Sequence, residues 1–178
     1  MINGLFIGRF QPFHKGHLAT VKFALERVDQ LIIVVGSAQK SHEFRNPFTA
    51  GERIRMIKES LDVDSEADVR RIMIIPVPDS EVHSLWTHQL DMLVPKYDVV
   101  FANDLFTLML FNERGIRAIE APLYRRNEMR ATEVRKRMAS EETWEDLVPL
   151  QVSKVIKEIK GVERVRALLQ RDMPDHAS

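Results

Sequence analysis

The stretch GLFIGRFQPFHKGH, residues 4–17, joins a short apolar run to the beginning of an amphipathic helix. Residues 4–8 show no alternation of polar and apolar side chains, which is typical of a strand buried on both faces. Pro12 and Gly16 punctuate a turn, after which apolar residues recur with helical spacing between Leu18 and Val28. The stretch therefore predicts a strand, a turn and a helix, which together form the repeating unit of a parallel sheet.

Similar units follow along the chain. Further strands are predicted at residues 31–36, 72–77, 98–102 and 117–120, where apolar and β-branched side chains dominate. Ile54, Ile57 and Leu61 have helical spacing, and Thr49 with Glu52 forms a capping box before them.

The C-terminal part of the sequence is continuously helical in its spacing. This pattern runs over about 132–172, with a break expected at Gly161. We therefore expect an α/β fold, a doubly wound parallel sheet with a helical C-terminal portion, in a single domain over residues 1–178. In such a sheet, ligands bind at the carboxyl ends of the strands.

Composition excludes several kinds of function. Lys and Arg together number 26, as do Asp and Glu, so there is no global basic charge to attract nucleic acid or a membrane surface. The absence of cysteine excludes disulfides, thiolate zinc sites and cysteine nucleophiles. The sequence shows neither a secretory leader nor an apolar run of about 18 residues, so we expect a cytoplasmic protein with no membrane or nucleic-acid partner.

The opening turn has the chemistry of an anion site. A strand-to-helix turn presents backbone N–H groups and the positive end of the helix dipole to a ligand. His14 and His17, three residues apart, share one side of the first helical turn, and Arg9 could donate two hydrogen bonds to a phosphate. A zinc site is disfavoured because no cysteine could complete it, and we predict no metal ligand. For either histidine alone, helix capping is an adequate explanation.

A second group of residues opens the C-terminal helices. Thr132 is predicted as a helix N-cap, with Arg135 in the first turn, where a cation opposes the helix dipole. A bound anion would resolve this conflict, although a solvated face formed with Lys136 and Arg137 is the alternative. The polar connection over 36–53 is long for a compact domain, which favours a functional loop.

The motif GRFQPFHKGH resembles the signature of the archaeal-type nicotinamide-nucleotide adenylyltransferase family, in the nucleotidylyltransferase superfamily. The likeness continues in GSAQKSH at 36–42, NPFTAGER at 46–53, IPVPD at 75–79 and TEVRKRM at 132–138. The resemblance implies a Rossmann-like nucleotidyltransferase fold and transfer of AMP from ATP to nicotinamide mononucleotide, giving NAD and pyrophosphate by direct in-line displacement. It also implies Mg²⁺ carried on the ATP phosphates and a homo-oligomer, with a hexamer as a common form.

The same resemblance implies roles for individual residues. It gives catalytic roles to Arg9, His14, His17 and Arg135. It gives binding of ATP and its phosphates to Gly8, Phe10, Gly16, Arg45, Thr132 and Asn103. It gives binding of the nicotinamide nucleotide to Gly36, Ser37, Asp79 and Trp86. From the residues themselves, Trp86 could equally be a core residue at helical spacing with its neighbours, and Asp79 could be a helix N-cap.

Two alternatives stay open at the level of sequence. A sister nucleotidylyltransferase would use the same triphosphate end with another phosphate acceptor, such as phosphopantetheine, FMN or a choline-type phosphate. A non-catalytic module that senses NAD or another nucleotide would bind tightly without turnover.

Overall fold

Strands and helices alternate along most of the chain. The computed structural model describes residues 1–122 and 130–172. The elements, in chain order, are β1 Asn3–Gly8, α1 Lys15–Leu25, β2 Gln30–Val35, α2 Ala50–Asp62, β3 Ile72–Pro76, α3 His83–Leu93, β4 Val99–Ala102, α4 Leu105–Glu113, β5 Arg117–Glu120, α5 Ala131–Ala139, α6 Leu150–Glu158 and α7 Gly161–Asp172. Short 3₁₀ turns lie at Val69–Arg71 and Glu145–Leu147.

The five strands form one parallel sheet in the order β3-β2-β1-β4-β5. In register, Gly8 at the end of β1 faces Val35 at the end of β2. The strand order reverses direction at β1, which is the point where doubly wound sheets open a crevice at their carboxyl edge. The predicted fold class is confirmed.

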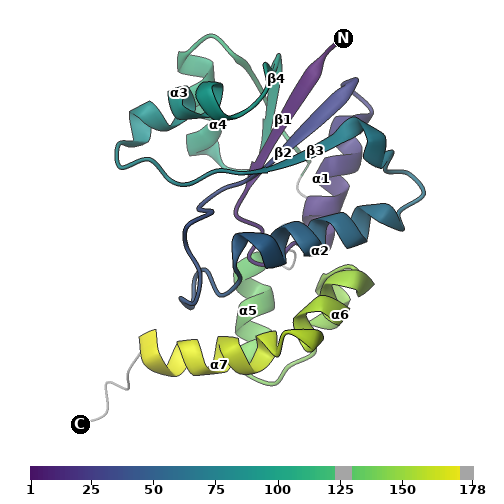
Figure 1. The fold of residues 1–178 in the computed structure, drawn as a ribbon, viewed down its shortest axis with the longest axis vertical. Helices are drawn as coiled ribbons and strands as arrows, with labels where there is room; N and C mark the ends of the chain where they lie inside the picture. Colours follow the sequence, from purple (N-terminus) through teal and green to yellow (C-terminus); the bar gives the residue numbers. More distant parts are fainter. Residues whose placement is uncertain (123–129, 173–178) are drawn as a thin grey trace.

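Helices cover both faces of the sheet (Figure 1). Phe6 of β1 and Ile33 of β2 belong to the core beneath α1 and α2, whereas their neighbours Leu5 and Ile32 belong to the core beneath α3 and α4. This alternation follows from the two-residue period of strand side chains. A strand with apolar residues on both faces can be buried only in such a three-layer arrangement.

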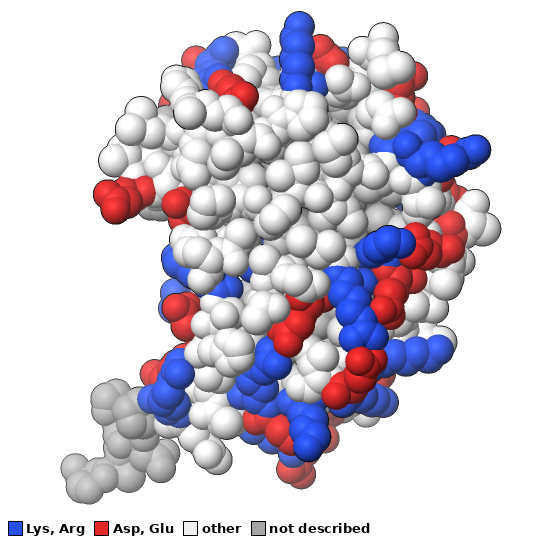
Figure 2. Space-filling view, in the orientation of Figure 1, with Lys and Arg blue, Asp and Glu red and all other residues white. Residues whose placement is uncertain are grey.

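The C-terminal helices α5, α6 and α7 form a group below α2 in Figure 1. Val152 and Ile156 of α6 and Val165 of α7 extend the core that α2 contributes to. The break expected at Gly161 falls at residues 159–160, and Gly161 begins α7, where a Cβ would lie 2.9 Å from the Phe48 ring. Figure 2 shows positive and negative side chains interspersed over this lower part of the molecule, in keeping with the zero net charge.

Local predictions were confirmed or corrected as follows. The capping box of Thr49 and Glu52 is present at the start of α2. Helix α1 ends at Leu25, so Val28 is buried in the turn after it rather than in the helix. Helix α5 has Arg130 as its N-cap, two residues earlier than expected, so the prediction that Thr132 is the N-cap was wrong.

The described helices have a further common property. None of them in residues 1–122 and 130–172 combines the length and the apolar character that crossing a membrane requires.

Candidate active site

The two histidines of the opening turn form a reciprocal capping box at the start of α1. The Nδ1 atom of His14 accepts from the His17 backbone N–H at 3.3 Å, and Nδ1 of His17 accepts from the His14 backbone N–H at 3.2 Å. The two rings stack, with centroids 3.5 Å apart and 21° between their planes. Because each neutral ring accepts at Nδ1, its proton lies on Nε2. The helix cap therefore leaves an Nε2–H donor on each ring.

Burial favours the neutral form of both rings. His14 is 6% exposed, and burial lowers its pKa to about 4. Burial also lowers the pKa of His17 well below its ordinary value, and repulsion from His14 lowers it further. Neutral N–H donors can bind phosphate oxygens, and a bound anion would raise both pKa values by stabilising the imidazolium form.

Arginines gather beside the histidines. Arg135 of α5 is 5% exposed, and its Nη1 donates to the carbonyl oxygen of Gln11 at 2.7 Å. Burial lowers its pKa to about 10, with further lowering by the charges of Arg9 and Arg45. Its Nε is buried without a hydrogen-bond partner in the described part of the chain. A guanidinium group repelled by two others, together with a spare buried donor, is the kind of arrangement that binds a polyanion.

A cavity of about 720 Å³ opens at the carboxyl ends of the strands. The predicted site residues that line it are Gly8, Arg9, Gly36, Ser37, Asp79 and Trp86. All four residues predicted to bind the nicotinamide nucleotide are thus brought together. Arg9 belongs both to this cavity and to the arginine group around Arg135, so the two parts of the site adjoin.

Asp79 is held in the cavity wall by three neighbours. Its Oδ1 accepts from the Ser37 hydroxyl at 2.8 Å, its Oδ2 pairs with Lys40 at 2.9 Å, and its backbone N–H donates to Gln39 at 3.0 Å. Burial alone would raise the pKa of Asp79, but the hydrogen bonds from Lys40 and Ser37 outweigh it and hold that pKa below its ordinary value. The alternative role as a helix N-cap was wrong, because α3 begins after Val82.

Trp86 lies between the core and the cavity. It lies on α3, half-buried, with its ring edge-on to Phe111 at a centroid distance of 6.3 Å. It also lines the cavity. One part of the indole therefore packs in the core while another part is available to a ligand ring.

The remaining predicted residues lie around these two parts. Arg45 is exposed on the loop between β2 and α2, and Gly16 is buried in the first turn of α1. Thr132 is exposed, and its hydroxyl accepts from Arg135 Nη2 at 3.5 Å. Asn103, just after β4, donates to the Thr20 hydroxyl at 3.4 Å, and its Oδ1 is buried without a partner among the described residues.

The side chain of Phe10 is buried in the core. Its ring is 1% exposed and packs edge-on against His17 at a centroid distance of 4.8 Å. A Cβ on Gly8 would lie 2.7 Å from this ring. Phe10 can therefore serve a phosphate site only through its backbone and through its support of His17.

Sequence reasoning missed Gln11 as a residue that organises the site. Its side-chain amide donates to the Phe48 carbonyl oxygen and accepts from the Phe48 N–H, both at 2.9 Å, while buried. It thus joins the opening turn to the end of the loop that carries Arg45. The partner lies 37 residues away, so the only available signal was an amide side chain between an aromatic residue and a proline.

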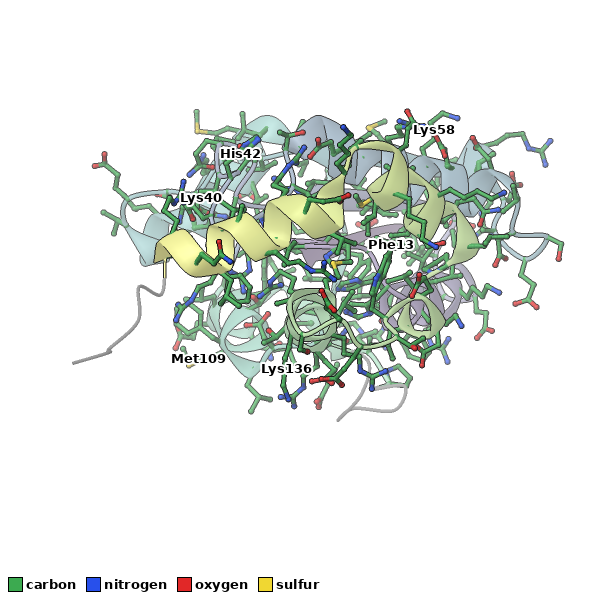
Figure 3. The ribbon with its side chains drawn as sticks, turned by 90° about the horizontal axis from the view of Figure 1, so that it is seen from below. Phe13, Lys40, His42, Lys58, Met109 and Lys136 are labelled. Carbon is green, nitrogen blue, oxygen red and sulfur yellow. The ribbon has the colours of Figure 1, made fainter. Side chains whose placement is uncertain are left out.

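Helix α7 holds the same loop from the other side. Arg171 donates to the His42 carbonyl oxygen and Asp172 accepts from the Phe44 N–H, both at 2.7 Å, and Arg164 donates to the Pro47 carbonyl oxygen at 3.2 Å. Figure 3 shows His42 near the C-terminal end of α7. These contacts join residues more than a hundred positions apart, and no local pattern indicates them.

Within the described ranges, no three histidine, aspartate or glutamate side chains are arranged to hold a metal ion. The donor set fits phosphate oxygens, which can themselves carry a divalent cation.

Comparison with known proteins gives consistent relatives. The cytidylyltransferase-like family model matches residues 5–137. A nicotinamide-nucleotide adenylyltransferase of Pyrococcus furiosus is 45% identical over 168 residues, covering 94% of this chain and 89% of that protein. Its counterpart from Saccharolobus solfataricus is also 45% identical, covering 97% of this chain and 99% of the relative.

Solved structures agree in fold. A bifunctional NMN adenylyltransferase/ADP ribose pyrophosphatase of Francisella tularensis, complexed with AMP and a manganese ion, matches with a TM-score of 0.78 and 25% identity. The match covers 93% of this chain and 52% of that one, so the chain spans about half of the bifunctional protein. A nicotinic acid mononucleotide adenylyltransferase of Plasmodium falciparum has the same fold at a TM-score of 0.64 and 13% identity, covering 92% of this chain and 98% of that one.

Proposed function

This chain belongs to the nicotinamide-nucleotide adenylyltransferase family and is a nucleotidyltransferase, and we propose that it forms NAD at the site that adjoins Arg9. The phosphate of nicotinamide mononucleotide attacks the α-phosphorus of ATP. A new P–O bond forms there as the bond to the β-phosphate oxygen breaks, and pyrophosphate leaves. The attacking phosphate is already an anion, so the reaction needs no general base and no covalent intermediate on the protein.

The observation that carries the proposal is the stacked histidine pair beside the arginine group. His14 and His17 each retain an Nε2–H donor, and Arg135 retains an unpartnered buried Nε. Preorganised donors of this kind stabilise charge that develops on phosphate oxygens as the pyrophosphate leaves. We assign these donors, with Arg9 and Arg45, to the triphosphate.

A divalent cation completes the charge balance, and we propose Mg²⁺. The relative from Francisella tularensis was solved with manganese, which supports use of a divalent ion in this family. Mg²⁺ keeps several waters and binds substrate phosphates readily, so it fits a site with few carboxylates. When bound, it neutralises charge on the phosphate oxygens. Arg9, His14, His17 and Arg135 would act on the same phosphates through hydrogen bonds.

The acceptor end lies in the cavity lined by Trp86 and Asp79. An electron-rich indole can stack on the cationic pyridinium ring of nicotinamide mononucleotide. Ser37 and Lys40 hold the Asp79 carboxylate in the wall. The cavity volume of about 720 Å³ is within the range of small-molecule sites.

The test is NAD formation from ATP and nicotinamide mononucleotide with Mg²⁺, with pyrophosphate measured in parallel. We expect equal amounts of the two products, and loss of one phosphate donor in His17→Ala should lower kcat by roughly 100-fold or more. His88→Ala, which removes an exposed histidine on α3, is the matched control. Pyrophosphate release only with another acceptor would make the protein a sister nucleotidylyltransferase. Nucleotide binding without any turnover would favour a sensing module.

A further inference from the structure

Arg53 of α2 is a fully buried cation that no step of the proposed reaction uses. It heads the fully buried side chains in volume, at 0% exposure. Burial lowers the pKa of Arg53 to about 10. The negative charge of Asp79 raises this pKa, and the positive charge of Arg9 lowers it further. A buried guanidinium is costly unless its donors are satisfied, so its hydrogen bonds define what it does.

The partners of Arg53 are four backbone carbonyl oxygens. Nη1 donates to Gly36 at 2.7 Å and to Arg9 at 2.8 Å. Nη2 donates to Ser37 at 3.1 Å, and Nε donates to Thr49 at 3.2 Å. Arg9 directly follows β1, and Gly36 and Ser37 directly follow β2. The side chain therefore joins the ends of two adjacent strands to the beginning of α2.

These carbonyl groups lie at the edge of the sheet where the anion site is. Carbonyl oxygens carry partial negative charge, and a triphosphate nearby would be repelled by any that remained unpaired. Arg53 pairs three of them at the strand ends and adds one positive charge next to residues that line the cavity. It also holds the backbone of Ser37, whose φ of 48° is one that residues other than glycine rarely adopt.

We propose that Arg53 is a positioning residue for triphosphate binding, which it serves by pairing the carbonyl oxygens at the ends of β1 and β2 and so holding Arg9 and Ser37 in place. It acts through those residues and does not touch the substrate. The proposal rests on the proposed function for the identity of the anion. It is independent of which acceptor the enzyme uses.

The test measures binding of inorganic tripolyphosphate with Mg²⁺ by calorimetry, and KM for ATP by initial rates. Arg53→Met removes the charge and the donors, and Arg53→Lys keeps the charge but cannot form the four hydrogen bonds. Arg55→Met is the matched control, because Arg55 lies two positions along α2 and pairs with Glu158 and Glu59 at the surface.

We expect Arg53→Met to weaken tripolyphosphate binding by roughly tenfold or more and to raise KM for ATP in parallel, with Arg53→Lys intermediate. Arg55→Met should stay within about twofold of the wild type. If Arg53→Met does not fold, Arg53→Lys decides by the same two measurements. A purely structural role would lower the folded fraction, and with it kcat, while leaving KM and the dissociation constant unchanged, and that result overturns the proposal.

The two proposals can fail separately. Wild type that binds tripolyphosphate but makes no NAD would contradict the proposed acceptor, and the order of affinities among the variants would still test Arg53. Wild type that makes NAD, with unchanged KM for ATP in a folded Arg53→Met, would overturn the role of Arg53 alone.

Discussion

Acid should destabilise the protein through its stacked histidines, and His14→Asn should remove a measurable part of this effect. His14 has a pKa of about 4 in the folded protein against an ordinary value of 6.5, so the unfolded chain binds more protons between these values. Burial of the neutral ring therefore stabilises the fold above the ordinary pKa, and this contribution is lost as the pH falls below 6.5 toward 4.

The size of the effect follows from the two pKa values. Each pH unit within the window changes the free energy of unfolding by about 1.4 kcal/mol for one proton. Lowering the pH from about 7 to about 5 should therefore cost the wild type about 2 kcal/mol through His14 alone. Asparagine at the same position can still accept the His17 N–H, because it is a preferred N-cap residue, but it does not titrate.

The assay is urea unfolding of both proteins at each pH, followed by fluorescence of the buried Trp144 and the half-buried Trp86. Titrating groups other than His14 and its neighbour His17 are shared, so they cancel in the difference between wild type and variant. Repulsion from His14 also lowers the pKa of His17, so the variant relieves part of the contribution of His17 as well. The stability of His14→Asn relative to the wild type should rise by about 2 kcal/mol on acidification. Parallel pH profiles for the two proteins would refute the reasoning. ATP should reduce the difference, since a bound anion raises the pKa of the imidazole.

Two further substitutions, each with a control, test the packing around Gly8 and the support of the loop after β2 by α7. Gly8→Ala should destabilise the fold by about 1–3 kcal/mol, because the new Cβ would lie 2.7 Å from a buried aromatic ring; Gly51→Ala, with no atom within 4 Å of its Cβ, should not, and thermal unfolding compares them. Arg164→Ala removes a tie between α7 and the loop after β2 and should raise KM for ATP several-fold in initial-rate assays. Arg164 also pairs bidentately with Glu52, and Arg55 pairs in the same way with Glu158, so Arg55→Ala is the control and should leave that KM unchanged. Equal effects of the two arginine substitutions on KM for ATP would contradict a role for the contact between Arg164 and the loop.

Much of the fold could be predicted because its signals are local. The strand at 117–120 has the predicted bounds, and the capping box of Thr49 and Glu52 begins α2 as expected. Helix α4 was not predicted, because LFTLMLF over 105–111 is apolar on every side and shows no helical period. Thr132 was misplaced as an N-cap because Arg130 has the extended backbone of that position without a capping hydrogen bond from its side chain.

The site could be predicted only where its residues lie in motifs. Arg9, His14 and His17 come from one turn. The stacking of the two histidine rings follows from their spacing of three residues at a helix start. Arg53 and Gln11 act through backbone groups 16 to 44 residues away, which no spacing rule connects. The individual site roles, the single domain over 1–178, the homo-oligomer and the cytoplasmic location stay predictions.

The contacts between α7 and the loop after β2 have a consequence for synthesis of the protein. Their partners are separated by 117 to 129 positions, so the loop is made long before the helix that holds it. A nascent chain whose sheet has already formed would still lack the support on this side of the nucleotide site. Full affinity for the nucleotide should thus appear late in synthesis, only after α7 has left the ribosome.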